Sequence, residues 1–160
     1  MKLVVLVGLP GSGKSTWLRD HNHTAISSDA IRGLLVDDET DQTIHRETFA
    51  VVRDLIRRRI ELGRPVTFVD ATNLTPKERR PYIRMGALYD VTVEALYFEI
   101  PVELCKTRNR RRRRMVPEEA IDQMAARLVP PSVEEGFARV VTISAGPAPI
   151  AGRAPESAPL

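Results

Sequence analysis

The segment Gly8-Leu-Pro-Gly-Ser-Gly-Lys-Ser-Thr16 constrains the fold of this 160-residue chain more than any other. It follows the apolar run from Leu3 to Val7 and leads into Trp17-Leu18-Arg19, so a strand is expected before it and a helix after it. Its glycines and lysine have the GxxxxGK spacing, and a serine comes next. Backbone N–H groups in such a turn point inward, and the following helix adds the positive end of its dipole. The segment is therefore predicted to be a P-loop that binds a nucleoside triphosphate.

Each residue type in this loop has a chemical role toward a phosphate or its metal ion. Gly11 lets the backbone curve around a β-phosphate, Lys14 reaches the β- and γ-oxygens, and the Ser15 hydroxyl ligates Mg²⁺. A glycine-rich turn without a ligand is the alternative, and the flanking strand and helix argue against it. The residues expected to bind ATP or another nucleoside triphosphate are Gly11, Ser12, Gly13, Lys14, Ser15 and Thr16.

Strand-like and helix-like segments alternate along the rest of the chain. Short apolar or β-branched segments lie at residues 24–28, 66–69, 91–100 and 140–143. Helical patterns begin near residues 16, 30, 43, 76, 101 and 117. This alternation predicts an α/β, three-layer fold of the P-loop NTPase type, in which helices flank a parallel sheet. A chain of this length has room for one domain, which we place at residues 1–143.

Arginines are concentrated in one block between residues 108 and 114, at the end of the helix that begins near Pro101. Together with the helix after Pro117, this block is predicted to form an arginine-rich helical lid over residues 106–118. Whether the block is a solvated face or a clamp for phosphates is left open. Beyond it, residues 144–160 are rich in Ala, Pro and Gly, and we expect them to be disordered.

The composition is that of an ordinary globular protein, with 42% hydrophobic and 28% charged residues. No run of residues approaches the length of a membrane span, so no membrane partner is expected. Cys105 is the only cysteine, and Met1 leads directly into the first predicted strand. We therefore expect a cytoplasmic location. Assembly into a homo-oligomer is left open.

Two aspartates follow predicted strands and are candidates for chemistry beside the loop. Asp29 ends the strand at residues 24–28, and Arg32 lies three residues further along. We expect Asp29 to accept a proton from the group that receives the phosphate, while Arg32 binds an adjacent anionic group. A simple ion pair between them is the alternative. Asp70 ends the strand at residues 66–69 and is expected to support Mg²⁺ opposite Ser15.

Three segments carry a resemblance to a known family. They are Ser27-Ser-Asp-Ala-Ile-Arg-Gly-Leu34, Asp37-Asp-Glu-Thr-Asp-Gln-Thr43 and Val69-Asp-Ala-Thr-Asn73. They resemble the kinase module of bacterial and phage polynucleotide 5′-hydroxyl kinases, especially the bacterial RNA-repair polynucleotide kinase-phosphatases. The resemblance extends over residues 1–143. No phosphatase or ligase-like module accompanies it in these 160 residues, so a stand-alone kinase and a domain of a longer protein both remain open.

The resemblance implies Mg²⁺-dependent transfer of the ATP γ-phosphate to a 5′-OH end of RNA or DNA in nucleic-acid repair. Asp29 would be the general base and Arg32 would contact the 3′-phosphate of the terminal nucleotide. Lid arginines matching this family would contact the donor phosphates, and a glutamine loop and the Asp-Ala-Thr-Asn element would belong to the substrate site. The positions so implied are Arg108, Arg112, Gln42 and Asn73.

Two other classes of function fit the same motifs. A small-molecule kinase could use a nucleotide sugar, a sugar or an antibiotic as acceptor. A regulatory ATPase would have no acceptor, but it would not need Arg32 beside Asp29. The arginine block favours a nucleic acid modestly, because arginine contacts to phosphates strengthen its binding. Neither the choice between RNA and DNA nor the donor base follows from the sequence.

Overall fold

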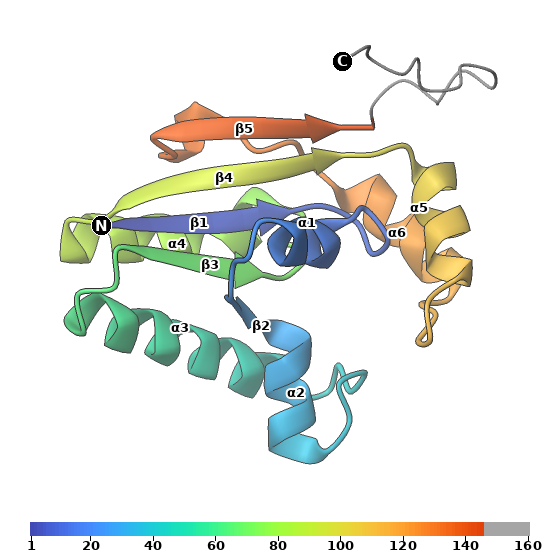
Figure 1. Cartoon of the computed structure of the whole chain (residues 1–160), viewed down its shortest axis with the longest axis horizontal. Coiled ribbons are helices and arrows are strands. Elements are labelled where there is room, and N and C mark those ends of the chain that lie inside the picture. The colour runs from blue at the N-terminus through green and yellow to red at the C-terminus, as the bar shows by residue number, and fades with distance from the viewer. Residues whose placement is uncertain (146–160) are drawn as a thin grey trace, which may run out of the picture.

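A five-stranded sheet forms the centre of the computed structural model, which describes residues 1–145 (Figure 1). The strand order is β2-β3-β1-β4-β5, and every neighbouring pair is parallel, so the predicted parallel sheet is confirmed. The strands are β1 (Lys2–Val7), β2 (Ala25–Ser27), β3 (Val66–Asp70), β4 (Thr92–Glu99) and β5 (Arg139–Ser144).

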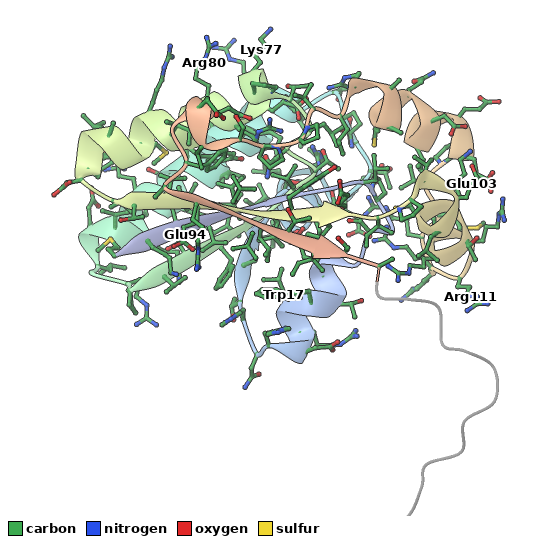
Figure 2. All side chains as sticks on the ribbon, turned by 90° about the horizontal axis from the view of Figure 1, so that it is seen from above. Trp17, Lys77, Arg80, Glu94, Glu103 and Arg111 are labelled. Atoms are coloured by element: carbon green, nitrogen blue, oxygen red, sulfur yellow. The ribbon has the colours of Figure 1, made fainter. Side chains whose placement is uncertain are left out.

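Helices cover both faces of the sheet, as the three-layer prediction requires. Figure 2 shows α4, with Lys77 and Arg80, on one side of the strands and α1, with Trp17, on the other. The helices are α1 (Lys14–Asp20), α2 (Ser28–Val36), α3 (His45–Glu61), α4 (Pro76–Tyr89), α5 (Val102–Arg110) and α6 (Glu118–Arg127), and a 3₁₀ turn, η1, spans Val133–Glu135.

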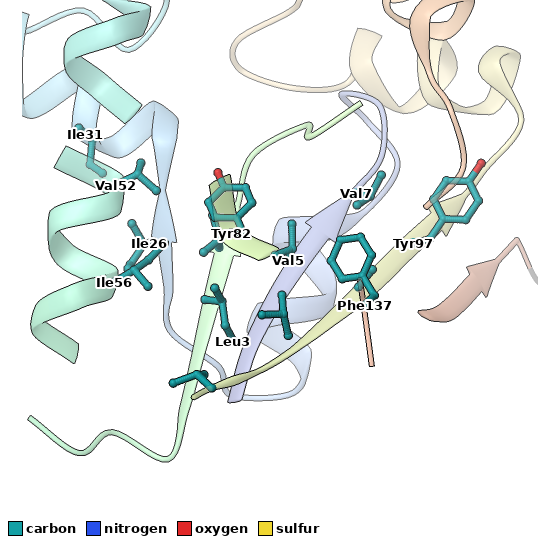
Figure 3. Packing of buried hydrophobic residues seen from close by; sticks show 14 residues of the cluster. Leu3, Val5, Val7, Ile26, Ile31, Val52, Ile56, Tyr82, Tyr97 and Phe137 are labelled. Carbon is teal, nitrogen blue, oxygen red and sulfur yellow. The ribbon is translucent and has the colours of Figure 1, made fainter. Parts of the chain in front are cut away.

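Strand β1 is apolar from Leu3 to Val7 because both of its faces are covered. Its residues Leu3, Val5 and Val7 join one core cluster, which includes Val52 and Ile56 of α3 and Tyr82 of α4 (Figure 3). The alternate residues of β1 join a second cluster on the opposite face, where α1 and α5 pack. Period-two alternation along a strand places successive side chains on opposite faces, so a single apolar strand supplies two cores.

Helix α2 begins at Ser28 rather than at Ala30, so the prediction that Asp29 ends a strand is wrong. The reason is local: the Ser27 hydroxyl accepts a hydrogen bond from the Ala30 backbone N–H at 3.3 Å and caps the helix. Asp29 therefore lies in the first turn of α2. An acidic side chain is favourable there, because it faces the positive end of the helix dipole.

Helix α5 ends at Arg110 rather than near Arg114, so the predicted length of this helix is also wrong. The Asn109 side chain closes the following turn by bonding both the carbonyl and the N–H of Val116, at 2.7 and 3.0 Å. A turn at residues 111–117 connects α5 to α6, and three of its arginines are exposed (111–113). The helical hairpin itself was predicted, and here it is formed by α5, this turn and α6.

The segment between α6 and β5 contains the turn η1, which the sequence pattern did not indicate. Glu135 of η1 forms a bidentate ion pair with Arg79 of α4, with N···O distances of 2.6 and 2.9 Å. The Arg79 side chain is fully buried. The expected disordered tail at 144–160 lies, from residue 146 on, outside the described residues. Within residues 1–145, no helix is both long and apolar enough to cross a membrane.

Candidate active site at the carboxyl ends of the strands

The carboxyl ends of three adjacent strands bring the predicted site residues to one edge of the sheet (Figure 1). The P-loop follows β1, Asp29 lies just after β2, and Asp70 is the last residue of β3. Ser27 of β2 is in register with Asp70, so Asp29, two residues after Ser27, and Asp70 lie at the ends of neighbouring strands. Ligands of open α/β sheets bind at this edge.

Two glycines give the loop its shape. Gly11 and Gly13 have φ values of +80° and +98°, in the left-handed region that other residues rarely adopt. A Cβ atom on Gly11 would lie 2.4 Å from the carbonyl oxygen of Cys105. Glycine at this position therefore lets the loop pack directly against helix α5, while Gly13 caps the start of α1.

Two polar groups of the loop fit a bound phosphate. Lys14 is only 8% exposed, and its Nζ donates to the carbonyl oxygens of Gly8 and Leu9 at 2.8 and 2.9 Å. The Ser12 hydroxyl is buried and has no hydrogen-bond partner among the described residues. A buried hydroxyl without a partner is unfavourable unless a ligand supplies one. Phosphate oxygens are acceptors that both side chains can use.

Burial lowers the pKa of the Lys14 ammonium below its ordinary value of 10.5. The Asp70 carboxylate opposes this shift, and the charge of Arg112 adds to it. Phosphate oxygens at the loop would favour the charged form and raise the pKa again. At a pH between the lowered pKa of Lys14 in the free protein and its higher pKa in the complex, nucleotide binding is therefore expected to take up a proton, and the affinity is expected to fall as pH rises.

This linkage is measurable by calorimetric titration with ADP at alkaline pH in two buffers of different ionisation enthalpy. Lys14→Met is expected to abolish the proton uptake, whereas Lys77→Met, at an exposed position of α4, should leave it unchanged. Identical heats in the two buffers for the unmodified protein would contradict this assignment.

Ser15 and Asp70 offer a pair of oxygens for a metal ion. The Ser15 hydroxyl donates to Asp70 Oδ2 at 3.1 Å, so both lie within reach of one cation. No group of three or more His, Cys, Asp or Glu side chains that could hold a metal occurs among residues 1–145. A magnesium ion here would take its remaining oxygens from phosphates and water, which is how Mg²⁺ is usually held in phosphoryl-transfer sites.

A second group of charged side chains at this edge surrounds Asp29. Arg32 lies one helical turn along α2 and donates to Asp29 Oδ1 at 2.8 Å, so the two residues form the ion pair that was the alternative to their predicted roles. Arg114, from the turn between α5 and α6, approaches Asp29 Oδ2 at 3.3 Å. Arg114 was not among the site residues predicted from the sequence. The one sequence signal for a role of Arg114 is its place in the arginine block.

Two other lid arginines lie near the loop. Arg108 Nη1 is 3.5 Å from the carbonyl oxygen of Ser12, and it is the nearest side-chain atom to the position of a Cβ on Gly13. Arg112 is exposed, and its charge acts on Lys14. Both positions suit contacts with donor phosphates. Arg111 projects outward from the end of α5 (Figure 2).

Gln42 is not brought into contact with these groups. Its side chain is exposed and donates to the carbonyl oxygen of Thr40, within the loop between α2 and α3.

Asn73 is placed beneath the loop, which does not fit the predicted contact with substrate. Its side chain is 2% exposed, and Nδ2 donates to the carbonyl oxygen of Leu6 at 2.7 Å. The neighbouring Thr72 carbonyl accepts from the N–H of Gly8, and the Asn73 carbonyl accepts from Arg79. The Asp-Ala-Thr-Asn element therefore connects the end of β3 to the base of the P-loop.

The fold and this site define a P-loop kinase-like domain. A family profile described as an AAA domain matches residues 3–131, and the chain belongs to this family. Structurally, the chain is similar to a sugar kinase of Janibacter sp. HTCC2649, with a TM-score of 0.61 and 18% identity over 90% of this chain and 85% of the other. It is equally similar to Chaetomium thermophilum Kti12 in complex with ADP-AlF3, with a TM-score of 0.61 and 17% identity over 89% and 88% of the two chains.

Among curated proteins, the chain is similar to the bifunctional polynucleotide phosphatase/kinase of Schizosaccharomyces pombe. The two are 25% identical over 146 residues, which make up 87% of this chain. The chain spans about a third of the length of that relative, since the match covers 32% of it.

Proposed function

We propose that the protein is a polynucleotide 5′-hydroxyl kinase that transfers the γ-phosphate of ATP to a 5′-OH end of RNA or DNA, in nucleic-acid repair. The observation that carries the proposal is the Asp29–Arg32 pair at the edge of the P-loop site, with the guanidinium 2.8 Å from the carboxylate and only 5% exposed. A carboxylate and a buried guanidinium side by side suit a hydroxyl with an anionic group next to it. The terminal nucleotide of a polynucleotide has both. The similarity to the S. pombe enzyme supports the same acceptor.

The residues divide the chemistry between donor and acceptor. Asp29 accepts the proton of the 5′-hydroxyl, whose oxygen forms a new bond to the γ-phosphorus. The bond from the γ-phosphorus to the bridging oxygen breaks, and ADP leaves. Lys14, with Arg108 and Arg112, stabilises the charge on the phosphate oxygens. Ser15 and Asp70 would hold magnesium, which would supply positive charge beside the phosphates.

A small-molecule kinase is the second candidate. The same Asp29–Arg32 pair fits any acceptor with a hydroxyl beside a phosphate or carboxylate, and a sugar kinase shares the fold. The exposed position of Gln42 does not distinguish the two candidate functions, because its side chain donates to the Thr40 carbonyl and contacts neither Asp29 nor Arg32.

A panel of acceptors with γ-labelled ATP and Mg²⁺ tests the proposal. We expect label on a 5′-OH oligonucleotide and on a nucleoside 3′-monophosphate, and little on a sugar or a nucleotide sugar. Arg32→Ala is expected to raise KM for the nucleoside 3′-monophosphate by about 10- to 100-fold, because hydrogen bonds to charged groups contribute about 1.5–3 kcal/mol. KM for the unphosphorylated nucleoside should change little. Label only on sugars, or release of free phosphate alone, would reject the polynucleotide acceptor.

A further inference from the structure

Arg114 connects the hairpin turn to two acidic side chains on the acceptor side. Its Nη2 lies 3.3 Å from Asp29 Oδ2, and its Nη1 lies 3.0 Å from Glu39 Oε1. The first contact joins residues 85 positions apart in the sequence. Arg114 is thus the residue through which the turn at 111–117 is tied to α2 and to the loop that follows it.

The two guanidinium groups lie on different carboxylate oxygens of Asp29. Arg32 donates to Oδ1 and Arg114 donates to Oδ2. Each oxygen keeps a further lone pair, so Asp29 can still accept the proton of a hydroxyl that binds beside these groups. When the acceptor also carries an anionic group, the geometry favours Arg114 as the guanidinium that turns to it. Its contact is the longer one, and its side chain is 31% exposed, whereas that of Arg32 is 5% exposed and anchored on the same helix as Asp29.

A guanidinium that leaves Asp29 needs another anion close by. Once Arg114 has turned away from Asp29, its contact with Glu39 is the one that remains of the two, and the Glu39 side chain is half exposed. An acceptor that places a phosphate next to its reactive hydroxyl would supply that anion directly beside Asp29. Arg32 also has unused donor capacity there, since its Nε is buried without a partner among the described residues. Two guanidinium groups would then share one acceptor phosphate.

We propose that Arg114 is a second ligand for the acceptor phosphate, held by Asp29 and Glu39 until the acceptor binds. This inference rests on the proposed function and deepens it, because it assigns a specificity-determining residue to the acceptor side. An acceptor without the phosphate leaves Arg114 on Asp29 and Glu39. A merely structural role, in which Arg114 only fastens the hairpin turn, would affect both kinds of acceptor equally.

Kinetics with paired acceptors separate these roles. In Arg114→Ala, we expect KM for a nucleoside 3′-monophosphate to rise by about 10- to 100-fold. KM for the matching nucleoside should change little, because that acceptor has no phosphate for Arg114 to bind. In Glu39→Gln, which weakens the resting contact, KM for the 3′-monophosphate should not rise. Arg113→Ala is the matched control, since this exposed neighbour removes the same charge from the same turn. Equal changes in KM for both acceptors in Arg114→Ala would overturn the proposal.

Binding measured without turnover keeps the inference separate from the proposed function. Calorimetric titration with nucleoside 3′-monophosphate, in the presence of ADP and Mg²⁺, should show a tighter complex than with the nucleoside, and Arg114→Ala should remove most of that difference. If the protein transfers no phosphate to nucleosides but this result holds, the proposed reaction is wrong and the phosphate contact stands. If the affinities of the two ligands are equal, or Arg114→Ala leaves their difference intact, the phosphate contact is wrong whatever the reaction.

Discussion

Replacing Asp29 by asparagine is expected to lower kcat for phosphorylation of a 5′-OH acceptor by about 10²–10⁴-fold, the usual contribution of a general base. Asparagine has the shape of aspartate and can still accept a hydrogen bond from Arg32, but it cannot accept the hydroxyl proton. ATP affinity should be preserved, because the donor contacts lie on the P-loop and the hairpin. Rapid-quench single-turnover kinetics, together with equilibrium binding of a non-hydrolysable ATP analogue, measure both effects.

Asp37→Asn is the matched control for this experiment. Asp37 ends the same helix, is exposed, and has φ +60°, a left-handed conformation that asparagine tolerates. The substitution changes charge and chemistry in the same way, and it should leave kcat close to that of the unmodified protein. If Asp29→Asn retained near-normal turnover, another group would have to take the proton.

Removing the Glu135 side chain is expected to lower the free energy of unfolding by about 3 kcal/mol, because it leaves the Arg79 guanidinium buried without its charged partner. The lower end of the usual range applies, since Glu135 is itself 15% exposed and Arg79 keeps one hydrogen bond, to the Asn73 carbonyl. Chemical denaturation of Glu135→Ala measures the loss.

An exposed ion pair provides the comparison for this second result. Arg58 and Asp54 on α3 are joined at 2.8 Å, but their side chains are 61% and 43% exposed. Arg58→Ala should therefore have a much smaller effect than Glu135→Ala. If the two substitutions destabilised the protein to the same extent, burial would not be what makes the Arg79–Glu135 pair important.

The features that the sequence predicted correctly depend on neighbouring residues. The P-loop is contiguous, so its glycines, Lys14 and Ser15 could be assigned from spacing alone. Apolar strands between helical patterns were enough to predict the parallel sheet. One longer-range feature was also expected: Asp70 lies opposite Ser15, 55 residues away, because the P-loop and Asp70 follow strands whose carboxyl ends meet at one edge of the sheet.

The features that were missed depend on side chains brought together by packing. Arg114 and Asp29 are far apart in the sequence, and nothing in a run of arginines distinguishes the member that reaches the acceptor side. The position of Asn73 beneath the loop depends on how β1 and β3 pair, which motif spacing does not encode. In contrast, the early start of α2 could have been predicted from the sequence, because a serine such as Ser27 followed by an acidic residue such as Asp29 is typical of a capped helix start.

The ion pair between Arg79 and Glu135 shows that the folded domain extends at least to residue 135. The family profile matches residues 3–131, and Glu135 and the whole of β5 lie beyond that segment. A fragment cut at residue 131 would leave Arg79 uncompensated, and it would turn β4 into an open edge flanked only by β1. Arg79 also supports the Asn73 carbonyl, and so the underside of the nucleotide loop. The folded domain is therefore longer than the segment that the family profile matches, and Glu135 of η1, beyond that segment, contributes through Arg79 to the structural support of the P-loop.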